Sequence, residues 1–160
     1  MAPNEQSRPI QTVLIAGLTA GALDITAACG FYGLRGVSPI RILQSVASGL
    51  LGSAAFTGGV PVVVLGAFLH FFIALVAAAV FYLVSRRLTF LVRQPVVSGM
   101  WYGVAVYLFM NHVVLPLSAV AKRPFDLGTA LIMVVIHIVC VGLPIALIIR
   151  RSSEQPKAGA

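Results

Sequence analysis

The stretch VVVLGAFLHFFIALVAAAVFYLV, residues 62–84, decides the class of this protein. Its one acidic or basic side chain is His70, and it is long enough for a helix to cross the bilayer core, which takes about 20 residues. Three more stretches are similarly apolar and of similar length. The sequence therefore predicts four membrane spans, called spans one to four in chain order: 11–33, 62–84, 97–118 and 128–149.

Composition points to the same class of protein. Of the 160 residues, 59% are hydrophobic and only 9% are charged, and the mean hydropathy is +1.02. A soluble domain carries about 25% charged residues. We therefore expect an all-α integral membrane four-helix bundle, with residues 1–160 forming a single membrane domain. The net charge of +7 lies in loops and tails, where it suits the lipid bilayer, so no nucleic-acid partner is expected.

The basic residues predict the orientation. The two tails and the loop between spans two and three hold seven: Arg8, Arg86, Arg87, Arg93, Arg150, Arg151 and Lys157. The other two loops hold four: Arg35, Arg41, Lys122 and Arg123. Loops rich in Lys and Arg stay in the cytoplasm, so both termini are expected there. The tails 1–9 and 152–160 are polar and are expected to be disordered.

The loop between spans one and two contains a further helix, predicted over 39–51. Ser38 suits the N-cap, Pro39 the first helical position and Gly52 the stop. Apolar residues recur at helical spacing: Ile40, Leu43, Val46, Ala47 and Leu50. The opposite face is polar, so we expect a short amphipathic helix in the outer membrane interface. Asp126 is expected to cap span four in the same way as Ser38.

Four polar side chains interrupt the four spans, one in each: Asp24, His70, His112 and His137. An Asp at the centre of a membrane helix costs about 2.5–3.5 kcal/mol, so such groups usually face one another or water. With a rise of 1.5 Å per residue, all four lie about 9–14 Å below the same end of the bundle. The sequence predicts one shared polar layer, to which Asn111 also belongs.

Small residues predict which helix faces pack. Gly17 and Gly21 share a stripe with Asp24, and Gly66 shares one with His70. Gly-xxx-Gly pairs let helix backbones approach closely. The expected packing positions are Gly17, Gly21, Gly66, Gly99 and Gly103.

Three uses of the polar layer stay open. The first is a hydrogen-bond network that fixes helix packing. The second is proton sensing or conduction, with Asp24 as charge partner, His70 and His137 as the titrating pair, and His112 with Asn111 as an outer gate.

The third use is a metal or haem site. His137 and Cys140 lie on one helix face, and His70 or His112 would complete the set of ligands. Two histidines on facing helices would suit haem iron. The chain has no CxxC pair and no HExxH motif. No resident cofactor is expected, with haem or a transition metal as the alternative.

The chain has a faint internal repeat. The first helix of each half carries a Gly-xxx-Gly pair, and the second carries one histidine and ends in Arg-Arg. This layout predicts two hairpins of like orientation, related by an axis along the membrane normal. Pro116 and Pro144 are expected to kink spans three and four.

Residues 108–117, LFMNHVVLPL, followed by Pro124–Leu127, resemble the third-helix region of the YagU-like inner-membrane proteins. His70, His137 and the stretch 148–151 fall in comparable places. The resemblance implies a bacterial inner-membrane location and a link to acid tolerance. Asp24 has no counterpart there and is argued from this sequence alone.

The expected function is that of a small bacterial inner-membrane protein that senses or conducts protons. A second possibility is a structural or accessory subunit, in a homo-oligomer or a larger membrane complex, and a third is a metal- or haem-binding protein. The chain has no paired buried carboxylates, nucleophile elbow or phosphate-binding glycine loop, so no enzyme is expected.

Overall fold

The computed structural model describes residues 7–121 and 124–154. This part of the chain is helical and contains no strand. Four helices are long and apolar enough to cross a membrane: Pro9–Gly33, Gly59–Ser85, Pro95–Leu117 and Leu127–Ser153. The four predicted spans are therefore confirmed as helices, and the chain is consistent with a multi-pass membrane protein.

Each span is built from one or more elements. Span one is α1 (Ser7–Gly33), and span two is α3 (Gly59–Ser85). Span three consists of α5 (Pro95–Phe109), η2 (Met110–Val114) and α6 (Leu115–Leu117). Span four consists of α7 (Leu127–Ile136), η3 (His137–Gly142) and α8 (Leu143–Glu154). Between spans lie α2 (Pro39–Leu51), η1 (Gly52–Phe56) and α4 (Phe90–Arg93).

The predicted disordered tails are too long. Because α1 begins at Ser7 and α8 ends at Glu154, residues 7–9 and 152–154 are helical. The remainder of both tails lies outside the described residues, as do Lys122 and Arg123.

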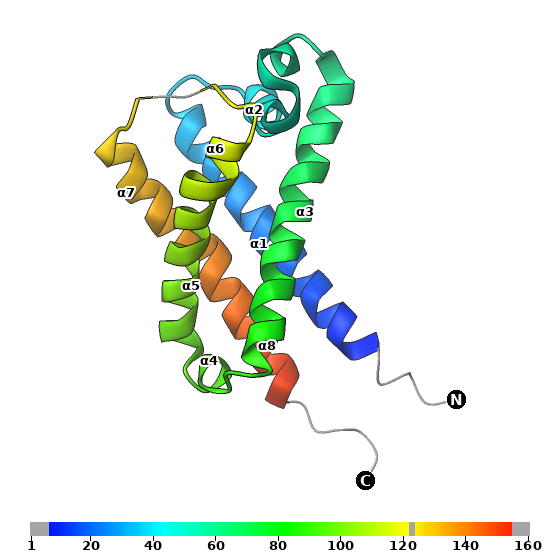
Figure 1. The fold of residues 1–160 in the computed structure, drawn as a ribbon, viewed down its shortest axis with the longest axis vertical. Helices are drawn as coiled ribbons and strands as arrows, with labels where there is room; N and C mark the ends of the chain where they lie inside the picture. Colours follow the sequence, from blue (N-terminus) through cyan, green and yellow to red (C-terminus); the bar gives the residue numbers. More distant parts are fainter. Residues whose placement is uncertain (1–6, 122–123, 155–160) are drawn as a thin grey trace.

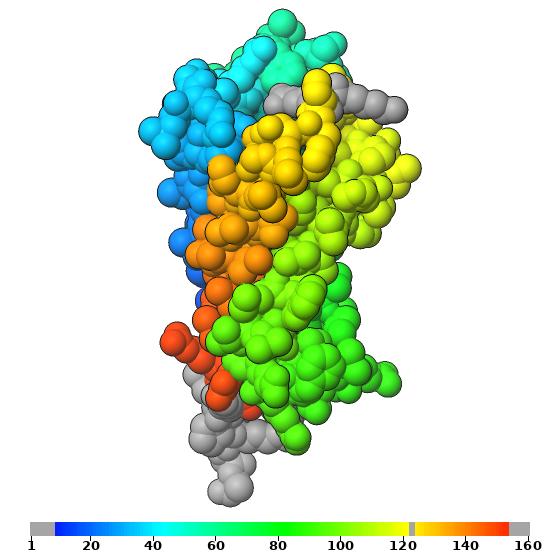
Figure 2. All heavy atoms as spheres, turned by 90° about the vertical axis from the view of Figure 1, so that its left-hand side faces the viewer, coloured from blue at the N-terminus to red at the C-terminus, as the bar shows by residue number. Residues whose placement is uncertain are grey.

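Span one and span four form the middle of the bundle (Figure 1). Helix α1 packs against α3 on one side and against η3 and α8 on the other, while α5 packs against η3 and α8. The beginning of α1, α4 and the end of α8 lie at one end, and α2 lies at the other. Figure 2 shows α7 and α5 side by side along the molecule, with the region around α2 covering that other end.

Helix α2 has the predicted bounds and caps. The Ser38 hydroxyl accepts a hydrogen bond from the Arg41 N–H (3.3 Å), and Gly52 ends the helix with φ of +58°. That backbone conformation suits glycine, which has no Cβ to clash.

The buried face of α2 is mixed in polarity and is not the purely apolar face that the sequence predicted. Ile42 and Ala47 are buried together with Gln44 and Ser48, whereas Ile40 and Leu50 are 59% and 65% exposed. Helix α2 packs on α3, where the Leu43 carbonyl fills the space beside Gly66.

Spans three and four each contain a π-helical segment just before a proline. Segment η2 ends two residues before Pro116, and η3 ends two residues before Pro144. Proline lacks an N–H and its ring crowds the carbonyl four residues earlier, so a wider turn is favoured there. The predicted kink sites are therefore π-helical segments, and they contain Asn111, His112, His137 and Cys140.

Candidate functional site

In the first hairpin, α1 and α3 approach closely at two glycines. A Cβ on Gly17 would lie 2.8 Å from the Leu75 Cα, and one on Gly21 would lie 2.8 Å from the Phe71 ring. Both distances are shorter than van der Waals contact. The two glycines therefore pack inside the chain, as the sequence predicted.

In the second hairpin, α5 meets η3 at another glycine pair. A Cβ on Gly103 would lie 2.6 Å from the His137 carbonyl oxygen, and one on Gly99 would lie 2.9 Å from that of Gly142. Gly142 completes this contact and was not predicted. The sequence signal that marks it is a glycine two residues before Pro144, in the span that pairs with a Gly-xxx-Gly helix.

His70 joins span two to span one. Its Nε2 donates a hydrogen bond to the carbonyl oxygen of Gly21 (2.8 Å). The ring is half-buried and meets the Phe71 ring edge-on, with centroids 5.4 Å apart. His70 is therefore a side chain that ties the α1–α3 crossing together.

His137 occupies the matching place in the second hairpin, with its backbone against Gly103. Its ring is engaged differently: Nδ1 donates to the Met133 carbonyl oxygen in the same helix (2.9 Å). The ring also meets Tyr107 of α5 edge-on at 5.5 Å. Each histidine thus lies opposite the second glycine of its hairpin, in agreement with the predicted repeat.

Asn111 and His112 bond within their own helix. The Asn111 amide donates to the Tyr107 carbonyl (2.9 Å), and His112 Nδ1 donates to that of Leu108 (3.0 Å). His112 is also exposed. The predicted outer gate, which requires these groups to face another span, is not what this geometry forms.

Asp24 is half-buried on α1, close enough to Cys140 for an electrostatic interaction. Within residues 7–121 and 124–154 its carboxylate has no hydrogen bond or ion pair with an imidazole. The three histidines bond to backbone carbonyls instead, so the direct contacts between Asp24 and the imidazoles that the proton hypothesis expects are not formed. The reason is that a helix carbonyl lies within hydrogen-bond distance of each imidazole N–H.

His70, His137 and Cys140 do not assemble into a ligand set. In the described part of the chain, no three His, Cys, Asp or Glu side chains come together as a metal site. The Nε2 of His70 is also occupied by its bond to Gly21, so it is not free to ligate haem iron. Cys29 and Cys140 are free thiols.

Tyr102 has a role that sequence reasoning missed. Near the start of span three and beside Trp101, its position in the sequence is typical of an interfacial aromatic belt. Instead its hydroxyl donates to the Ala77 carbonyl of span two (2.6 Å), and its ring meets Phe81 edge-on at 4.9 Å. The run of small residues around Ala77 is the signal that room for a large ring exists there.

Spans one and four are also joined directly, because the hydroxyl groups of Thr12 in α1 and Ser152 in α8 form a hydrogen bond. Bonds between spans are therefore spread over separate places in the bundle.

No family model matches this chain, and no curated protein and no solved structure matches it either. The likeness to the YagU-like proteins therefore stays a prediction.

Proposed function

We propose that this chain is a small multi-pass protein of a bacterial inner membrane, with both termini in the cytoplasm, that senses protons through His70. The observation that carries the proposal is the hydrogen bond from His70 Nε2 to Gly21 across the α1–α3 crossing. Histidine is the side chain that changes charge nearest to neutral pH. A titrating group at a helix crossing couples protonation to packing.

The proposed change starts at the crossing. The neutral ring uses Nε2–H for Gly21, so an added proton goes to Nδ1 and creates a cation among apolar neighbours such as Phe71. A buried charge is costly unless it is paired. Asp24, one turn beyond Gly21, interacts with Cys140 of η3 rather than with α3. We propose that the unpaired charge on His70 weakens the α1–α3 crossing.

Sensing is favoured over conduction because the intramembrane histidines are not neighbours in a relay. His70 bonds to α1, whereas His112 and His137 bond to carbonyls of their own helices. A proton path needs donors and acceptors in succession. The accessory-subunit alternative has less support, since the glycine stripes that would dock other helices are used within the chain.

The test is the pH dependence of stability in lipid nanodiscs. His70→Gln keeps an amide donor for Gly21 but cannot titrate. We expect the wild-type unfolding midpoint to fall between pH 8 and pH 5, and His70→Gln to remove most of that change. His112→Gln is the matched control, because His112 is exposed and bonds only to its own helix, and it should retain the wild-type profile.

Two results would contradict the proposal. One is a His70→Gln profile that equals the wild type. The other is proton flux into liposomes that the wild type supports and His70→Gln abolishes, since this would make His70 part of a conduit.

A further inference from the structure

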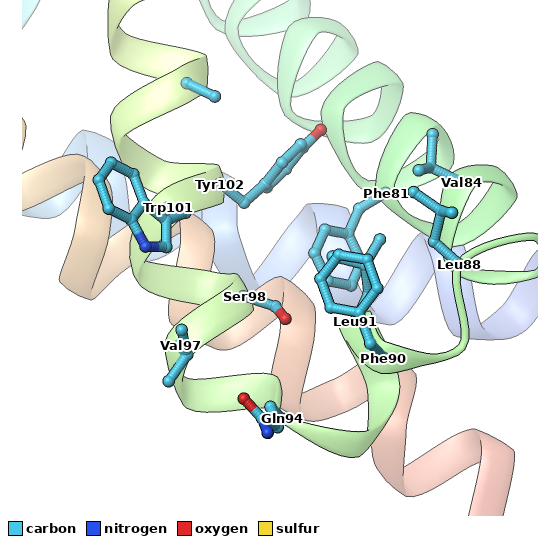
Figure 3. Close-up of a pocket in the computed structure, with 11 residues that line it drawn as sticks. Phe81, Val84, Leu88, Phe90, Leu91, Gln94, Val97, Ser98, Trp101 and Tyr102 are labelled. Atoms are coloured by element: carbon cyan, nitrogen blue, oxygen red, sulfur yellow. The ribbon is translucent and has the colours of Figure 1, made fainter.

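A groove of about 460 Å³ opens between α3 and α5, beside the turn that contains α4 (Figure 3). Its walls are almost wholly apolar and include Phe81, Leu88, Leu91, Val97, Trp101 and Ala105. Tyr102 lines the groove, and its hydroxyl donates a hydrogen bond to the Ala77 carbonyl of α3.

Two polar residues, Gln94 and Ser98, line one end of the groove. Gln94 and Ser98 lie at the start of α5, next to α4, while Trp101 and Ala105 lie further along the span. The groove therefore has a polar end at the turn and an apolar length that runs into the span. This is the arrangement of a phospholipid's head and chain.

The turn is strongly basic. Residues 86–94 contain three arginines and no acidic residue. Arg87 directly precedes Leu88, and Arg93 directly precedes Gln94, both of which line the groove. Both arginine side chains are exposed, and neither forms a hydrogen bond or ion pair with the described parts of the chain.

Three other arginines have contacts away from this groove. Arg86 points to the Tyr82 hydroxyl (3.5 Å), and Tyr82 lines a second, apolar groove between α1 and α3. Arg35 and Arg41 lie over aromatic rings, 3.7 Å from that of Phe31 and 4.2 Å from that of Phe56. Among the described arginines, Arg87 and Arg93 are the two that directly precede residues lining the groove, whereas Arg150 and Arg151 belong to α8.

We infer that this groove binds one anionic phospholipid, with an acyl chain against Trp101 and Ala105 and the phosphate held by Arg87 and Arg93. Guanidinium groups bind phosphate through charge-assisted hydrogen bonds. Basic pockets between spanning helices recognise anionic lipid head groups. The groove is independent of His70, so this inference does not rest on the proposed function.

Native mass spectrometry of the full chain tests it. The protein is titrated with phosphatidylglycerol or with phosphatidylethanolamine carrying the same acyl chains. We expect one phosphatidylglycerol to bind in preference. Arg87→Gln with Arg93→Gln should weaken its binding about 30-fold, the effect of removing two basic residues from a lipid surface.

Arg35→Gln with Arg41→Gln is the matched control, because it removes the same charge at the opposite end. Wild-type binding in this control supports the site, whereas equal loss in both double variants overturns it. Equal binding of the two lipids by the wild type also overturns it.

A third variant tests the apolar part of the groove separately from the two arginines. Ala105→Trp fills the apolar length and should abolish retention of the bound lipid, while retention at the wild-type level would overturn the inference. A benzophenone amino acid at position 105, irradiated in cell membranes, identifies the occupant. An adduct with the mass of a lipid supports the site, and an adduct with another polypeptide overturns it in favour of a helix-docking surface.

Discussion

The two hairpins of this protein share a pattern of two glycines and one histidine, but different atoms make the contact between their helices. In each hairpin, the second spanning helix packs on the Gly-xxx-Gly pair of the first, and a histidine of the second helix lies opposite the second glycine. In the first hairpin the contact is made by the His70 side chain, which bonds to the Gly21 carbonyl. In the second it is made by the His137 backbone, which lies against Gly103, while the ring bonds along its own helix.

The difference follows from helix geometry. Helix α3 is α-helical throughout, and at Gly21 it presents side chains, those of Phe71 and His70. Segment η3 is π-helical and includes Gly142, so it presents its backbone to α5. Closer backbones leave no space between the helices for an imidazole. Equivalent positions in a repeat therefore need not have equivalent roles.

The largest effect should come from adding a methyl group at each crossing. At Gly103 the new Cβ meets backbone atoms at 2.6 Å, whereas at Gly21 its nearest neighbours belong to the Phe71 ring, which can move. We expect Gly103→Ala to cost about 3 kcal/mol and Gly21→Ala about 1 kcal/mol, the two ends of the range for overpacking. Unfolding in mixed micelles by added SDS measures both.

Gly30→Ala serves as the control, because no atom lies within 4 Å of the Cβ it would add. It should leave stability unchanged or slightly higher. If Gly21→Ala costs as much as Gly103→Ala, the contrast between side-chain and backbone contact is wrong.

The next effect concerns the cap of α2, which only the first hairpin has. Ser38→Ala removes the acceptor for the Arg41 N–H and should cost about 1 kcal/mol. Ser38→Asp retains an acceptor and should stay near the wild type. The unfolding midpoint of each variant gives the comparison, and a neutral Ser38→Ala would show that packing of α2 on α3 suffices without its cap.

A smaller effect should follow from loosening the bridge between hairpins. Tyr102→Phe removes the hydrogen bond to Ala77 but keeps the ring against Phe81, so we expect a cost of about 0.6 kcal/mol. Tyr107→Phe is the control, because the Tyr107 hydroxyl has no hydrogen bond within the described residues. Equal losses of stability in the two variants would show that the hydrogen bond from Tyr102 to Ala77 does not stabilise the fold.

The smallest effect is a pH dependence at the cap of span four. Hydrogen bonds from Thr129 lower the pKa of Asp126 below its usual value of 3.8. A carboxyl with a lowered pKa stabilises the fold above its unfolded pKa, and the contribution is lost as the pH falls through the folded one. Asp126→Asn should therefore flatten the stability profile below about pH 4. Comparing unfolding midpoints of the wild type and Asp126→Asn from pH 6 to pH 2.5 measures this, and parallel profiles would contradict it.

Local features of this chain were predictable because their causes lie close in sequence. The four spans follow from runs of apolar residues, and α2 follows from Ser38, Pro39 and Gly52, all confirmed in the structure. The cap at Asp126 was also predicted, and the Asp126 carboxylate accepts the N–H of Thr129 (2.8 Å). Packing at Gly17 and Gly103 follows from the small-residue spacing that lets backbones approach.

The candidate site was not predictable in the same way. Sequence register placed Asp24 and the histidines at similar depth, which made one polar layer plausible. Depth does not fix the rotation of each helix about its axis or the carbonyl nearest each ring. Those depend on how α1, α3, α5 and span four pack, and on the π-helical segments before Pro116 and Pro144.

The sequence by itself therefore determined that the described part of the chain is helical, how many of its helices can cross a membrane, and that five glycines pack, though not Gly142. Tertiary structure alone decided that His70 bonds across a crossing, that His137 and His112 bond to their own helices, and that Tyr102 bonds to α3 beside a groove. The physical reason is the distance along the chain over which each kind of interaction acts. Hydrophobic length and capping act within a few residues, whereas a hydrogen bond such as that of His70 to Gly21 joins positions 49 residues apart.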